Sequence, residues 1–253
     1  MHNLQIELRK LAKPGKIPIY KNFFKTGKGE YGEGDEFIGV TVPDSRKVAK
    51  ANVDISYEDL VHIIKSGIHE DRLCALITLV YKFEKAKTER EIKRVADFYI
   101  QYHLYGNNWD LVDTVSYKIL GPWLNNRDKS LLYEYARSSN LWERRIAIIT
   151  TLHFIRQGKF EDTIKISEIL LNDKDDLIHK AVGWMLREMG KREQQTLINF
   201  LNKYYKNMPR TMLRYSIERL PEQLRKGYLA KNNLFPRIIQ NTASVFPGEF
   251  DSL

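Results

Sequence analysis

Residues 69–83 read HEDRLCALITLVYKF, and two later stretches repeat their pattern. These are LWERRIAIITTLHFI at 141–155 and DDLIHKAVGWMLREM at 175–189. Each stretch opens with polar or charged residues and then places apolar residues at the i, i+3, i+4 spacing of one helix face. We therefore predict three equivalent amphipathic helices.

A small residue recurs inside each stretch, at Ala75, Ala147 and Ala181. The intervals indicate a period of about 36 residues, which is typical of stacked helix pairs. The helical spacing of apolar residues continues through most of the chain from Asp54 to Leu229. Short segments that contain Gly, Asn or Pro interrupt it, Gly121-Pro122 among them. We predict an all-α fold, an α-solenoid of HEAT-like pairs with a concave basic face; an irregular helical bundle is the alternative.

The predicted organisation is one repeat domain over residues 1–253. Residues 1–50 form an N-terminal helical cap with a Gly-rich loop, 51–231 the helical repeats and 232–253 a C-terminal tail. We expect one or two helices in the cap and a further helix from about Asp44. Residues 27–32 match G-x-G-x-x-G, but no strand precedes them and no helix follows, so we reject a dinucleotide site.

The composition excludes several classes of protein. Hydrophobic residues make up 43% of the chain, yet no apolar run approaches the ~18 residues of a membrane span. The N-terminus lacks the apolar stretch of a secretory signal. A single cysteine, Cys74, lies in an apolar run that we assign to the core, and it rules out an intrachain disulfide. We expect a cytoplasmic protein, and since the histidines show no metal spacing, we expect no metal.

Positive charge is concentrated near the C-terminus. The formal net charge is +9, and residues 191–237 hold eleven basic residues against three acidic ones. Such a region suits a polyanion such as the phosphate backbone of DNA. A solvated surface explains the basicity equally well.

Three motifs carry candidate chemistry. Trp109 and Asp113 are one helical turn apart behind an N-cap at Asn107 or Asn108, so a ring and a carboxylate share one face and can cradle a cation. Arg144 and Arg145 are adjacent, so both cannot face the core, and one can clamp a phosphate. Each pair also has a purely structural interpretation: a packed Trp with an Asp that binds the backbone, and two arginines on the surface. Trp184 follows Gly183 in the middle of a helix, where glycine indicates close packing; the ring is either core or ligand-facing.

Taken together, these elements resemble the AlkD-like family of bacterial DNA alkylation-repair glycosylases. The likeness rests on short segments in the same order along the chain: 21–26 (KNFFKT), 31–43 (YGEGDEFIGVTVP), 108–113 (NWDLVD), 142–145 (WERR) and 179–188 (HKAVGWMLRE). It implies a fold of HEAT-like helix pairs, which agrees with the periodicity. It also implies a cofactor-free monomer that removes N3- and N7-alkylpurines from double-stranded DNA.

The resemblance assigns roles to four residues. Asp113 would stabilise an oxocarbenium-like transition state and position water, Trp109 and Trp184 would pack against the deoxyribose, and Arg145 would hold a phosphate. Asp113 needs no raised pKa, because the charged base leaves without a general acid.

Six further cations are predicted to bind DNA: Arg144, Lys180, Arg187, Lys191, Arg210 and Arg214. The family also implies contact through the backbone of the lesion nucleotide, without a base-recognition pocket. Some relatives have lost the catalytic residues or favour branched DNA. A non-catalytic binder of damaged or branched DNA and a protein-interaction scaffold are therefore the alternatives.

Overall fold

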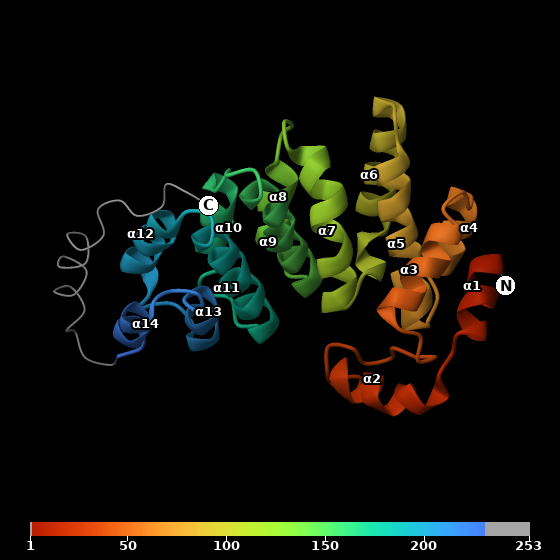
Figure 1. The fold of residues 1–253 in the computed structure, drawn as a ribbon, viewed down its shortest axis with the longest axis horizontal. Coiled ribbons are helices and arrows are strands. Elements are labelled where there is room, and N and C mark those ends of the chain that lie inside the picture. Colours follow the sequence, from red (N-terminus) through yellow and green to blue (C-terminus); the bar gives the residue numbers. More distant parts are fainter. Residues whose placement is uncertain (1, 231–253) are drawn as a thin grey trace, which may run out of the picture. The chain divides into compact units, whose positions relative to one another are not determined.

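The structure, a computed structural model, describes residues 2–230 (Figure 1). The chain divides into two compact units, Met1–Leu170 and Leu171–Leu253, and each is described by itself. The predicted tail at 232–253 lies outside the described residues. The prediction of one repeat domain over the whole chain stays a prediction.

The first unit consists of helices joined by short loops. Its α-helices are α1 (Asn3–Lys10), α2 (Ile17–Phe23), α3 (Val42–Ala51), α4 (Tyr57–Ile64), α5 (His69–Lys85), α6 (Glu89–Tyr102), α7 (Trp109–Leu124), α8 (Ser130–Ala136), α9 (Leu141–Ile155) and α10 (Glu161–Ile169). Two short 3-10 helices lie at Pro14–Lys16 and His103–Tyr105.

The second unit holds α11 (Asp176–Gly190), α12 (Gln194–Tyr204), α13 (Arg210–Ser216) and α14 (Glu222–Leu229). Residues 2–230 contain no strand beyond one isolated β-bridge between Glu36 and Ile68, so the all-α prediction is confirmed. None of the helices in this range is long and apolar enough to cross a bilayer.

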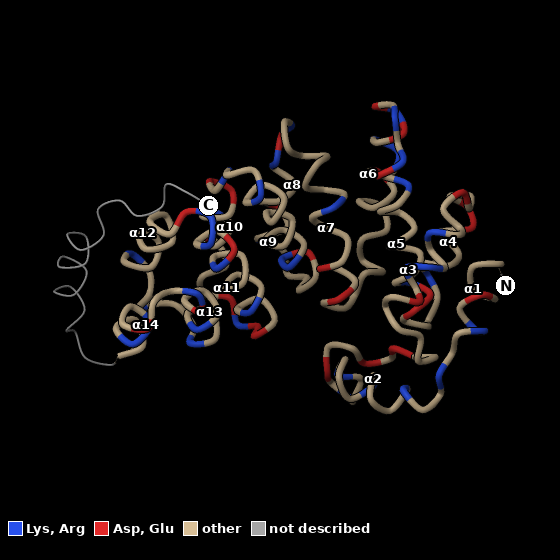
Figure 2. Tube along the Cα trace, viewed as in Figure 1, with Lys and Arg blue, Asp and Glu red and all other residues tan. Residues whose placement is uncertain are grey.

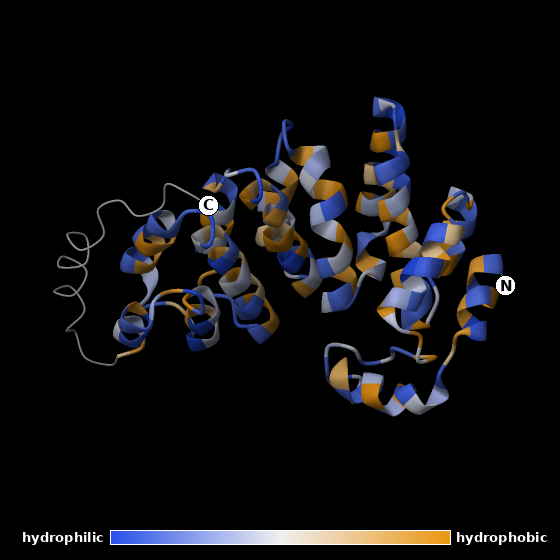
Figure 3. Ribbon diagram, viewed as in Figure 1, coloured by the Kyte–Doolittle hydropathy of each residue, from blue (hydrophilic) through white to orange (hydrophobic). Residues whose placement is uncertain are grey.

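The helices of the first unit pack as successive pairs. One row runs α3, α5, α7, α9, each helix against the next, and α4, α6, α8 and α10 pack against this row (Figure 1). This two-layer arrangement is consistent with the predicted α-solenoid. Apolar residues gather on the faces that the helices turn toward each other (Figure 3). Cys74 is buried there, as predicted, and so are Ala75 and Ala147.

Helix α7 differs from the prediction in one respect. Gly121-Pro122 was expected to break the chain, but α7 continues through both residues to Leu124. Pro122 has no N–H to donate to the carbonyl oxygen of Lys118, so one helical hydrogen bond is lost, and α7 ends two residues later. Gly121 is needed for the contact with α9, because a Cβ built on it would lie 2.3 Å from Cβ of His153.

The N-terminal cap is fastened to α5 by a buried carboxylate. Glu70 accepts hydrogen bonds from the backbone N–H groups of Ile38, Gly39 and Val40 at 2.8–3.2 Å. Gly39 has φ +83°, and a Cβ there would meet the carbonyl oxygen of Lys13 at 2.1 Å. The loop is thereby fixed, and it holds α2 beside the first turns of α5 and α7.

In the second unit, α11 packs against α12 and α13. A Cβ built on Gly183 would lie 2.5 Å from Cβ of Tyr215 and 2.6 Å from the carbonyl oxygen of Met212. The close packing predicted at Gly183 is confirmed, and it is a contact between α11 and α13.

Candidate active site

An ion pair joins α7 to α9 at the centre of the candidate site. Arg145 donates from Nε to Oδ1 of Asp113 at 2.8 Å and from Nη2 to Oδ2 at 2.7 Å. The side chain of Asp113 is 15% exposed and that of Arg145 only 6%. Two parallel hydrogen bonds from one guanidinium fix the plane of the carboxylate. The family resemblance placed both residues in the site but did not predict that they bind each other.

The electrostatic surroundings of Asp113 act in opposite directions. Burial raises the pKa of this carboxyl above its usual range, and the charge and hydrogen bonds of Arg145 counteract part of that rise. The mechanism that the resemblance implies needs no raised pKa at Asp113. The raised pKa follows from the burial of this side chain. With both oxygens accepting from Arg145, the geometry is that of the ionised carboxylate.

Trp109 is the first residue of α7, one turn before Asp113. Asn108 caps the helix, its Oδ1 accepting from the N–H of Trp109 at 2.8 Å, which confirms the predicted N-cap. The indole stacks on Phe24 with the ring centroids 5.5 Å apart, and the edge-on ring of Phe23 also lies 5.5 Å away. Phe23, the last residue of α2, and Phe24, which caps that helix, hold Trp109 in place.

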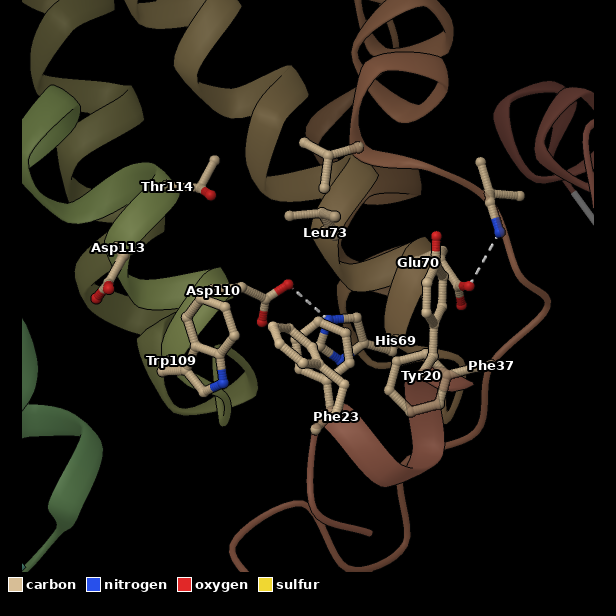
Figure 4. A pocket seen from close by; sticks show the side chains of 13 residues that line it. Tyr20, Phe23, Phe37, His69, Glu70, Leu73, Trp109, Asp110, Asp113 and Thr114 are labelled. Atoms are coloured by element: carbon tan, nitrogen blue, oxygen red, sulfur yellow. Dashed lines mark hydrogen bonds and ion pairs between the residues drawn. The ribbon is translucent and has the colours of Figure 1, made fainter. Parts of the chain in front are cut away.

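A pocket of about 360 Å³ opens between α2, α3, α5 and α7 (Figure 4). Most of its lining is aromatic or aliphatic. The lining residues are Tyr20, Phe23, Phe24, Phe37, Val40, Val42, His69, Glu70, Leu73, Trp109, Asp110, Asp113 and Thr114. The sequence-based reading contained no such pocket.

A buried chain of charges lies along one side of the pocket. His69 contacts Asp35 through Nδ1 at 3.0 Å and Asp110 through Nε2 at 2.9 Å, and Arg72 donates to Asp35 at 2.5 Å. Burial alone lowers the pKa of His69, but Asp110 and Asp35 outweigh it and raise the pKa to about 9. His69 is therefore an imidazolium at neutral pH.

This chain of charges was missed at the sequence level. The sequence assigned His69 and Arg72 only to the polar start of a helix. It placed Asp35 only in the segment 31–43 that carries the family resemblance. Burial acts to raise the pKa of Asp35, but its hydrogen bond to His69 and the charge of Arg72 outweigh burial and lower it. The network ties the cap loop, α5 and α7 together at the pocket.

The structure brings three of the four predicted catalytic residues together: Trp109, Asp113 and Arg145. The fourth, Trp184, is a half-buried residue of α11 in the second unit. Of the predicted DNA contacts, Arg144 belongs to the first unit and donates to the carbonyl oxygens of Ser138 and Ser139 at 3.1 and 2.9 Å. Its guanidinium thus also stabilises the loop before α9.

The other predicted DNA contacts lie on or next to α11 and α13, where basic residues are frequent (Figure 2). Three of them pair with acidic neighbours: Lys180 with Asp176 at 2.8 Å, Lys191 with Glu188 at 2.7 Å, and Arg187 with Glu218. Arg210 and Arg214 are exposed on α13. Whether these residues bind DNA stays a prediction.

Residues 2–230 hold no group of three or more His, Cys, Asp or Glu side chains arranged to bind a metal ion. The chemistry that the described groups can supply is that of a fixed carboxylate beside an aromatic face. A carboxylate in a partly buried site stabilises a nearby positive charge more strongly than it would in water.

Comparison with known proteins identifies a similar fold and a family. A solved structure described as a predicted DNA alkylation repair enzyme from Enterococcus faecalis is similar, with a TM-score of 0.65 and 17% sequence identity. The match covers 83% of this chain and 97% of the other, and at this identity it shows the shared fold. Among curated proteins, none matches. The sequence model of the family described as DNA alkylation repair enzyme matches residues 4–220, and the chain belongs to that family.

Proposed function

We propose that the protein is a DNA glycosylase that hydrolyses the N-glycosidic bond of cationic N3- and N7-alkylpurines in double-stranded DNA. The observation that carries the proposal is the carboxylate of Asp113, oriented by Arg145 and one helical turn from the ring of Trp109. Membership of the DNA alkylation repair enzyme family supports a role in repairing alkylated DNA.

The proposed reaction begins from a weakened bond. An alkylated purine carries a positive charge, so the bond between C1′ and the purine nitrogen breaks with its electron pair leaving on the base. Positive charge then develops on the deoxyribose, as in glycoside hydrolysis. Asp113 stabilises this charge and orients a water molecule, whose oxygen bonds to C1′ while its proton passes to the carboxylate or to solvent. One such electrostatic contact contributes on the order of 3 kcal/mol.

The remaining residues have supporting roles in the proposal. Trp109 offers an aromatic face to the developing cation, while the role that the resemblance gives to Trp184 stays a prediction. Arg145 fixes the Asp113 carboxylate and contacts the phosphate beside the lesion. The exposed arginines of α13 contribute phosphate contacts that set affinity without reading sequence.

The test measures release of 7-methylguanine and 3-methyladenine from methylated duplex DNA in EDTA. Wild-type protein is expected to release both bases, and Asp113→Asn to lose at least about 100-fold in rate. Asp97→Asn is the matched control, because Asp97 is a half-exposed carboxylate on α6 and is expected to leave the rate unchanged.

Two other results would favour the alternatives. Absence of release by wild type, with tight and salt-sensitive DNA binding, would indicate a non-catalytic binder of damaged or branched DNA. Absence of both release and DNA binding would indicate a protein-interaction scaffold.

A further inference from the structure

The N-terminal cap carries a group of positive charges of its own. Residues 8–29 hold seven basic residues and no acidic one. Arg9 pairs with Asp71, and Nζ of Lys13 lies 3.6 Å from Asp44. The other five form no ion pair with any acid of residues 2–230, and all but Lys16 are exposed: Lys10, Lys16, Lys21, Lys25 and Lys28.

Helix α2, in the middle of this segment, also exposes two large apolar side chains. Ile19 is 63% exposed and Phe23 is 58% exposed, more than any other large hydrophobic side chain of residues 2–230. The two are four residues apart and therefore neighbours on the helix surface. Apolar surface in contact with water is unfavourable, and an apolar patch with charges around it is typical of an interaction site.

Aromatic packing holds α2 in place from its other side. Phe24, the C-cap residue, stacks on Phe37 with the ring centroids 5.3 Å apart, and Tyr20 lies edge-on to both rings at 6.2 and 5.9 Å. The exposed ring of Phe23 is 5.5 Å from that of Trp109, so the apolar patch adjoins the candidate active site (Figure 4). A surface that is fixed in this way loses little conformational freedom when it binds a partner.

We propose that α2 and its flanking loops, residues 13–28, form a DNA-contact surface beside the active site. The lysines bind phosphates, and Ile19 and Phe23 pack against sugars and base edges in the adjoining minor groove. The inference rests on the proposed glycosylase function, because the deoxyribose at Asp113 fixes where the duplex lies. It agrees with recognition through the DNA backbone, which the family resemblance implies, and adds contacts to the nucleotides next to the lesion.

The dimensions and chemistry of the surface fit a duplex. Helix α2 has seven residues, so it is about 10 Å long and spans about three nucleotide steps of one strand at about 3.4 Å each. Lysine binds a phosphate as a point charge without reading sequence. Phe and Ile are among the apolar side chains that proteins insert into the minor groove. Since Phe23 contacts Trp109, a deoxyribose at Trp109 brings its neighbours within reach of α2.

The first test measures the phosphate contacts. Binding of the full chain to a duplex that carries a tetrahydrofuran abasic-site analogue is followed by fluorescence anisotropy over a range of salt concentrations, so the measurement needs no base release. Each phosphate contact contributes about 0.9 to the slope of log affinity against log salt concentration, and Lys21→Gln/Lys25→Gln should therefore reduce the slope by about 2. The control Arg90→Gln/Lys93→Gln on α6 should not change it. An unchanged slope in the α2 variant would overturn the proposal.

The second test measures the apolar contact with the same duplex. Ile19→Ser removes an exposed apolar side chain without touching Trp109, and we expect it to lower affinity at least about 5-fold and to keep the wild-type slope. Leu104→Ser is the matched control, because Leu104 is 51% exposed on the 3-10 helix His103–Tyr105, and it should bind as wild type. Equal affinity of Ile19→Ser and wild type would contradict the apolar contact.

A chemical probe locates α2 on the DNA. Cys74 is buried, so Asn22→Cys, at an exposed position of α2, supplies a thiol that reagents can reach. With an iron–EDTA label on this thiol, we expect strand cleavage confined to the nucleotides next to the abasic analogue. The same label on Gln101→Cys, an exposed position of α6, should give none. Even cleavage along the duplex, or none, from the label on α2 would overturn the proposal.

The two proposals can fail separately. If wild type releases alkylpurines but Lys21→Gln/Lys25→Gln keeps the wild-type slope, the glycosylase stands and the α2 surface is wrong. If that variant reduces the slope but wild type releases no base, the surface stands and the glycosylase is wrong. Binding to phosphatidylserine–phosphatidylcholine vesicles that this variant loses, with its DNA slope unchanged, would assign the surface to a bilayer instead. Urea unfolding of each variant confirms that the effects arise in folded protein.

Discussion

The guanidinium of Arg145 covers both carboxylate oxygens of Asp113, with N–O distances of 2.8 and 2.7 Å across the contact between α7 and α9. These helices approach closely because Gly121 presents no side chain to His153. The ion pair is therefore set by backbone packing rather than by a flexible loop. A carboxylate held in this way needs no reorganisation when positive charge develops beside it.

The first prediction concerns stability. Arg145→Met leaves the carboxylate of Asp113 mostly buried without its partner, and we expect the free energy of unfolding to fall by about 3 kcal/mol. The double variant Arg145→Met/Asp113→Leu removes the stranded charge and should recover at least about 1 kcal/mol of that loss. Urea unfolding measures both.

Arg90→Met is the control for these two variants. Arg90 is exposed on α6, so its replacement should change the free energy of unfolding by no more than about 0.5 kcal/mol. A double variant less stable than Arg145→Met would show that the pair is not the source of the effect.

The second prediction concerns the pH dependence of base release. Protonation of Asp113 removes the charge that the reaction needs, so the rate should fall as pH decreases through the pKa of this residue. Burial raises that pKa, so the midpoint should lie above the value of about 3.9 of an ordinary aspartate. Arg145→Lys loses the two-pronged contact and should move the midpoint further up.

Single-turnover rates between pH 4 and 8, corrected with Asp113→Asn for spontaneous base loss, provide the measurement. A rate that falls on the acid side with a midpoint at or below the pKa of an ordinary aspartate would contradict the prediction.

Local features of the fold could be predicted from the sequence. The starts of α5, α9 and α11, the burial of Cys74, the N-cap at Asn108 and the close contact at Gly183 all follow from periodicity and residue type. The family resemblance then selected Trp109, Asp113 and Arg145 from residues whose local sequence is equally compatible with structural roles.

Contacts between distant residues could not be predicted in the same way. Asp113 and Arg145 are 32 residues apart, and His69 meets acids 34 residues before it and 41 after it. These pairs depend on how neighbouring helices and the cap loop pack, which a helical period does not specify. The pocket was missed for the same reason, since its wall combines residues from four helices and a loop.

The third prediction concerns the His69 network and stability at high pH. The pKa of His69 is higher in the folded protein than in the unfolded chain, so protonation of His69 stabilises the fold. This stabilisation is fully present below about pH 6.5 and is lost as pH rises through about 9. The contribution is on the order of 3 kcal/mol. Urea unfolding at pH 6 and 9.5 should show this loss in wild type and not in His69→Gln.

His62→Gln is the matched control, because His62 is exposed on α4 and its replacement should leave the pH dependence of wild type intact. An equal decline in His69→Gln and wild type would place the titrating group elsewhere.

The last prediction separates a DNA-binding protein from a protein-interaction scaffold through salt dependence. Arg210 and Arg214 are one turn apart and exposed on α13, so both are able to reach a phosphate backbone. Each phosphate contact contributes about 0.9 to the slope of log affinity against log salt concentration. The variant Arg210→Gln/Arg214→Gln should therefore reduce the slope for duplex DNA by about 2, whereas Arg90→Gln/Lys93→Gln on α6 should not change it. Equal slopes for both variants and wild type would remove α13 from the DNA-binding surface. A carboxylate does not neutralise a phosphate, so Asp113→Asn should keep the wild-type salt slope even where it abolishes base release. DNA binding and catalysis can therefore be measured separately in one protein.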